Sequence, residues 1–132
     1  MRRDVVILAC AISAGIHGAL TPEHFAEGAP AGLGFAVSTV ALALVAVALT
    51  FRPQSDAALA AAAVLFAGLI VAYAAAVTTG VPLLHPEREA VDGLALFTKA
   101  IEAAGLLAAW SLFHPQTKGH AWHALHVRSR SS

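Results

Sequence analysis

The sequence has little charge and almost no cysteine. Lys, Arg, Asp and Glu make up 12% of its 132 residues, about half of the roughly 25% found in soluble domains. A chain with so little polar surface is not an ordinary soluble enzyme, a disordered chain or a coiled coil. The single cysteine, Cys10, excludes an internal disulfide and a cysteine-based zinc cluster. The formal net charge is +0, so no basic excess favours nucleic acid, and we expect no nucleic-acid partner.

Apolar and small residues take the place of the missing charge. Hydrophobic residues make up 58% of the chain, above the roughly 45–50% of soluble proteins. Ala, Gly and Val dominate, and such small side chains let helices approach closely in a bilayer. The composition therefore indicates an integral membrane protein. Its first partner is the lipid bilayer, and small side chains leave room for a homo-oligomer or a larger membrane complex.

Four long runs of mostly apolar residues follow one another with short polar connections. Each is close to the roughly 20 residues that a helix needs to cross a hydrocarbon core. The predicted fold is all-α, a polytopic membrane protein built as an up-down bundle of four transmembrane helices. The expected helices span about 5–21, 31–51, 57–79 and 93–113, within a transmembrane domain 1–113 that precedes a His/Arg-containing cytoplasmic tail, 114–132.

Polar residues at the run boundaries predict where helices begin and end. We expect Pro22 to end the first helix, because proline cannot donate to the backbone ladder. Ser55 or Asp56 is expected to cap the third helix, and Asp92 the fourth.

The basic residues predict the orientation in the membrane. Six of the eight lie before the first run, between the second and third, or after the fourth: Arg2, Arg3, Arg52, Lys118, Arg128 and Arg130. By alternation these three places share one side, and basic loops face the cytoplasm. We therefore expect a multi-pass plasma-membrane protein with both termini cytoplasmic and acidic loops outside.

Four polar residues inside the runs form a predicted polar cup: His17, Tyr73, Lys99 and Glu102. Glu102 lies nine residues inside the fourth helix, about 13–14 Å along its axis. A charge at that depth normally faces the bundle interior. Two interpretations of Lys99 and Glu102 stay open, an intrahelical ion pair or a functional buried carboxylate. His17 is either a member of this network or an interfacial histidine.

Histidines and carboxylates also gather in the two outer loops. Glu23, His24 and Glu27 follow the first helix, and His85 lies in the second loop. Imidazole and carboxylate ligands suit transition metals. We therefore expect these four residues to form a metal site, with Zn or Cu as the cofactor. The spacing matches no zinc-protease motif.

The tail carries three further histidines, His120, His123 and His126, beside Trp122. The favoured interpretation is a juxtamembrane segment anchored at the interface by Trp122. A cytoplasmic metal site is the alternative.

The pattern of polar residues resembles small four-helix membrane proteins common in high-GC actinobacteria. The resemblance covers most of residues 5–113. It is carried by His-x4-Pro-Glu-His-x2-Glu at 17–27, Gly-x-Gly-Phe at 32–35, Tyr73, Thr-Thr-Gly-Val-Pro at 78–82, His-Pro-Glu at 85–87 and Thr-Lys-x2-Glu at 98–102. It implies a four-helix fold and a membrane location, and it transfers no mechanism.

Three functions are compatible with these residues. The leading one is an outward-facing polar, His-acidic site that binds or handles a transition metal. The second is an accessory or assembly subunit of a larger membrane complex. The third is a small membrane enzyme acting on a lipid or quinone. An enzyme is the less favoured class, and no catalytic residue is assigned.

Overall fold

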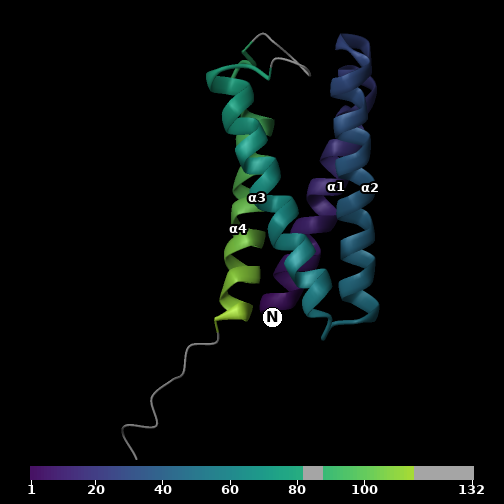
Figure 1. Cartoon of the computed structure of the whole chain (residues 1–132), viewed down its shortest axis with the longest axis vertical. Helices are drawn as coiled ribbons and strands as arrows, with labels where there is room; N and C mark the ends of the chain where they lie inside the picture. The colour runs from purple at the N-terminus through teal and green to yellow at the C-terminus, as the bar shows by residue number, and fades with distance from the viewer. Residues whose placement is uncertain (82–87, 115–132) are drawn as a thin grey trace, which may run out of the picture.

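The computed structural model describes residues 1–81 and 88–114, and these form an all-helical structure (Figure 1). The four helices are α1 (Arg2–Glu27), α2 (Ala29–Phe51), α3 (Asp56–Thr78) and α4 (Gly93–Phe113). Each is long and apolar enough to cross a membrane. The large hydrophobic side chains of α2 that point away from the other helices, such as Val40 and Leu44, are more than half exposed.

Helices that follow one another in the sequence pack together, and the first helix also packs against the last. α1 packs against α2 and α4, and α3 packs against α4 and α2. Figure 1 shows two helical hairpins, α1 with α2 and α3 with α4, which draw apart toward the end that holds the α1–α2 connection. At the opposite end, the Arg2 Nη1 group donates to the Ser111 carbonyl at 3.2 Å and so joins the start of α1 to the end of α4.

The apolar core occupies the half of the structure where the hairpins meet. Its largest members, Phe66, Leu42, Leu49 and Leu59, are all less than 2% exposed. Gly105 of α4 lies against this cluster, where a Cβ atom would come within 2.5 Å of the Phe66 ring. The core therefore depends on a backbone approach that only a residue without a side chain permits.

The predicted caps of α3 and α4 are confirmed. The Ser55 side chain accepts a hydrogen bond from the Ala58 amide at 3.2 Å. The Asp92 side chain accepts one from the Ala95 amide at 2.8 Å. Each satisfies an amide that the first helical turn leaves without an intrahelical partner.

The predicted end of the first helix is wrong. α1 continues through Pro22 to Glu27, and Gly28 alone separates it from α2. Proline is tolerated within apolar helices when neighbouring groups satisfy the backbone around it. The other helix boundaries lie close to the expected ones.

The predicted tail begins at the end of α4. His114 is the C-cap residue, and its ring stacks on that of Trp110 with centroids 4.6 Å apart. His120, Trp122, His123 and His126 lie outside the described residues, and so do the alternatives that depend on them.

Gly105→Ala tests the close approach in the core. The added methyl group meets the Phe66 ring and the Ala9 side chain, so we expect a loss of about 1–3 kcal/mol of stability, as in other overpacked cores. Thermal unfolding in detergent measures it. Gly68→Ala is the matched control, because a Cβ atom there has no neighbouring heavy atom within 4 Å. Equal stability of the two variants would contradict this packing.

Candidate functional site

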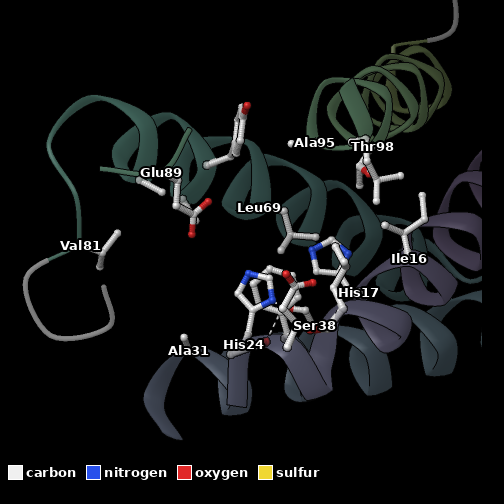
Figure 2. A pocket seen from close by; sticks show the side chains of 18 of the residues that line it. Ile16, His17, His24, Ala31, Ser38, Leu69, Val81, Glu89, Ala95 and Thr98 are labelled. Atoms are coloured by element: carbon white, nitrogen blue, oxygen red, sulfur yellow. Dashed lines mark hydrogen bonds between the residues drawn. The ribbon is translucent and has the colours of Figure 1, made fainter. Parts of the chain in front are cut away.

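A cavity of about 510 Å³ lies between the two hairpins, in the half that the apolar core leaves unfilled (Figure 2). All four helices and the segment 88–92 contribute to its lining. Its volume falls within the range of about 300–1,000 Å³ that small-molecule sites occupy. The cavity exists because the hairpins separate above the core, so the fold itself creates space for a ligand.

An ion pair closes the base of this cavity. The Lys99 Nζ atom lies 2.6 Å from Glu102 Oε2, and the Glu102 side chain is 0% exposed. Lys99 lines the cavity and also donates to the Leu69 carbonyl at 3.4 Å. Its Nζ lies 5.6 Å from the centre of the Tyr73 ring, within cation–π range. Lys99 therefore has its charge balanced by Glu102 while one face stays open to the cavity.

The second oxygen of Glu102 is held from α1. Ser13 Oγ donates to Glu102 Oε1 at 2.8 Å. His17 Nδ1 lies 2.9 Å from the Ser13 carbonyl and 3.3 Å from Ser13 Oγ. A carbonyl can only accept, so Nδ1 carries the proton. A chain of hydrogen bonds therefore runs from the cavity-lining ring of His17 through Ser13 to Glu102 and Lys99.

A second histidine lines the cavity two helical turns beyond His17. His24 Nδ1 donates to the Leu20 carbonyl at 3.0 Å. Its ring stacks on Phe35 of α2 with centroids 3.6 Å apart, and the His17 ring lies 5.2 Å from the same Phe35 centroid. Figure 2 shows both imidazoles rising from α1 toward the other side of the cavity. Their seven-residue spacing places both on this face because α1 is unbroken at Pro22.

The structure brings the residues of the predicted polar cup to one place. His17, Tyr73 and Lys99 line the cavity, and Glu102 lies directly behind Lys99. His17 is only 6% exposed. Tyr73 Oη is buried, and within residues 1–81 and 88–114 it has no hydrogen-bond partner. Lys99 and Glu102 form an ion pair, which is one of the two interpretations left open above. The role of these residues stays a prediction.

The metal-binding prediction finds no support. Glu23, His24 and Glu27 line the cavity rim, but His85 lies outside the described residues. In the part of the chain that the structure describes, no group of three His, Cys, Asp or Glu side chains is placed to hold a metal ion. His24 instead donates to its own helix and stacks on Phe35, so its position is explained without a metal.

Three contributors to the site were not expected from the sequence. Ser13 lies one turn before His17 on the same helix face, a spacing that could have indicated their contact. Phe35 contacts His17 because α1 packs against α2, and it contacts His24 because α1 also continues past Pro22. Arg88 lies on the rim at the edge of the described segment, and no pattern in the sequence pointed to it.

Comparison of the chain with known protein families, with characterised proteins and with solved structures finds no match.

Replacing each member of the ion pair tests whether Lys99 and Glu102 stabilise one another. Removing one partner leaves a buried charge uncompensated, so Lys99→Met or Glu102→Met should each cost about 3–5 kcal/mol of unfolding free energy. The double variant should cost clearly less than the sum of the two. Chemical unfolding of the four proteins in detergent gives the coupling energy.

The exposed ion pair between the N-terminal amine and Asp4, at the same i, i+3 spacing, provides the control. Asp4→Asn should change stability by only about 0–1 kcal/mol. Additive losses for Lys99→Met and Glu102→Met would refute the coupling.

Proposed function

We propose that this protein is a multi-pass plasma-membrane protein that binds a small amphipathic molecule in the cavity between its two hairpins. In this proposal the four helices form an up-down bundle, both termini are cytoplasmic, and the cavity opens toward the outside. The ligand places a polar group near His17 and an apolar body against the walls. Lipids and quinones have this general build.

The observation that carries the proposal is the charged network at the base of the cavity. Burying charge costs several kcal/mol per ion, and a well-packed apolar pair is often as stable. Lys99 and Glu102 nevertheless lie deep within an apolar helix. Ionisable groups at such depth are candidates for function by default, and here they adjoin a cavity large enough for a ligand.

The charge distribution supports the proposed orientation. Arg2, Arg3 and Arg52 lie at the end where the hairpins meet. The cavity rim at the other end carries Glu23 and Glu89. Basic residues remain on the cytoplasmic side during insertion. The cavity then opens away from the cytoplasm, and the apolar core fills the cytoplasmic half.

The cavity lining combines the two properties that an amphipathic ligand needs. Leu20 and Leu69 give it apolar walls, and Phe35 and Tyr73 add aromatic faces. Its polar side chains include His17 and Lys99 at the base and carboxylates such as Glu23 and Glu89 toward the rim. Ligand sites in proteins combine apolar walls with polar groups that orient the ligand.

The other functions expected from the sequence gain less from this geometry. A transition-metal site lacks a placed ligand set among the described residues. Association with a second copy or a larger membrane complex stays a prediction. Chemistry on the bound molecule is not part of the proposal, which concerns binding.

Filling the cavity from α2 tests the proposal. Gly34 lines the cavity, and a Cβ atom at this position has no neighbouring heavy atom within 4 Å. Gly34→Leu should therefore fold normally and occupy ligand space. The probes are phenyl compounds of similar size: uncharged triphenylphosphine oxide, the tetraphenylphosphonium cation and the tetraphenylborate anion. At least one should bind the native protein, and Gly34→Leu should weaken it at least about tenfold, or 1.4 kcal/mol.

Gly68→Leu is the matched control. It adds the same side chain to an equally open position of α3 that does not line the cavity. Equilibrium dialysis in an uncharged detergent measures the binding of each probe. The proposal fails if no probe binds, or if Gly34→Leu and Gly68→Leu bind the probes equally.

A further inference from the structure

Carboxylates outnumber bases around the cavity. Its described lining contains four acidic side chains, listed here with their segments: Glu23 and Glu27 of α1, and Glu89 and Asp92 before α4. The basic side chains in the same lining are Arg88 and Lys99. Glu102 balances Lys99 at 2.6 Å. The potential in this part of the cavity is therefore negative, and low-dielectric walls focus such a field.

The hydrogen-bonding groups on α1 also favour a positively charged or hydrogen-donating ligand group. His17 and His24 both donate through Nδ1 to a carbonyl of their own helix. In the neutral ring the other nitrogen, Nε2, is then an acceptor. Neither Nε2 has a hydrogen-bond partner among the described residues. For His17 this acceptor belongs to a side chain that is 6% exposed and lines the cavity, so it is placed to receive a proton donor from a ligand.

Aromatic rings are a third feature of the cavity lining. The Phe35 ring lines the cavity, and its centroid lies 3.6 Å from that of His24 and 5.2 Å from that of His17. The Tyr73 ring already has the Lys99 ammonium at 5.6 Å from its centre. Aromatic rings attract cations through their negative faces, and such rings form cages for ammonium ligands.

We propose that the ligand is an amphipathic organic cation, an apolar body that carries a protonated amine or another onium centre. The acidic rim attracts the charge, the Nε2 acceptors lie beside it, and the apolar walls hold the body. This inference rests on the proposed function and narrows it to one class of ligand. An anionic molecule of the same shape meets repulsion at the rim.

Tetraphenylphosphonium and tetraphenylborate separate charge from shape, because the two ions have nearly the same size and opposite charge. For each ion, the amount bound by Gly34→Leu is subtracted from the amount bound by the native protein. This difference corrects for partition of the ions into the detergent. We expect the cation to bind at least about tenfold more tightly than the anion, the low end of the enrichment that a focused potential gives. The difference should shrink as salt rises from 0.01 to about 0.5 M, because salt screens exposed charges.

Variants of the rim carboxylates test whether they cause the tighter binding of the cation. The double variant Glu23→Gln with Glu89→Gln should weaken binding of the cation severalfold and leave that of triphenylphosphine oxide unchanged. Asp56→Asn is the matched control, since Asp56 is an exposed carboxylate that begins α3 at the other end of the molecule. It should leave the binding of both probes unchanged.

The outcomes distinguish the inference from the proposed function. If the anion binds as tightly as the cation in the component that Gly34→Leu removes, the inference is overturned and the binding function stands. An equal effect of Asp56→Asn and the double variant on the cation also overturns it. If no probe shows such a component, both fail.

Discussion

The buried ion pair between Lys99 and Glu102 is the constraint on which the rest of the site depends. A carboxylate that is 0% exposed within an apolar helix needs a partner for each of its oxygens. Lys99 supplies one from the same helix, and Ser13 supplies the other from α1. The hydrogen bonds to Glu102 therefore connect α4 to α1. Glu102 also marks the level at which the apolar core ends and the polar part of the interior begins.

The two halves of the molecule follow from that boundary. On one side, small residues such as Gly105 let the helices approach and enclose Phe66. On the other side, the hairpins separate, and the side chains between them are too few to fill the space. The cavity is thus the part of the interior that the apolar core does not reach. His17 and Lys99 lie at its base, where they contact the packed half and line the cavity.

Local sequence patterns predicted much of this, and contacts between distant segments account for the rest. Apolar runs of helical length indicated the four helices, and Asp92 indicated the start of α4. The i, i+3 spacing of Lys99 and Glu102 placed them on one helix face and made an ion pair one of the two open interpretations. The bond from Ser13 to Glu102 joins residues 89 positions apart, so it depends on packing that no local pattern encodes.

The largest error concerned the end of the first helix, which was predicted at Pro22. Proline disfavours helix continuation locally, but α1 continues through it to Glu27. The contact of Phe35 with His24 was missed for the same reason, since it requires α1 to extend to Glu27. Of the expected site residues, the histidine and carboxylates that follow Pro22 lie on the cavity rim, and among the described residues they form no group placed to hold a metal ion.

The central claim is that Lys99 and Glu102 are in contact inside the folded protein, and it can be measured in a lipid bilayer. Solid-state NMR of protein labelled with ¹⁵N at the lysine Nζ and ¹³C at the glutamate carboxyl group reports on close N–C pairs. The account predicts a strong dipolar coupling between Lys99 and Glu102 that disappears in Glu102→Gln. A spectrum without such coupling, or one that Glu102→Gln leaves unchanged, would contradict it.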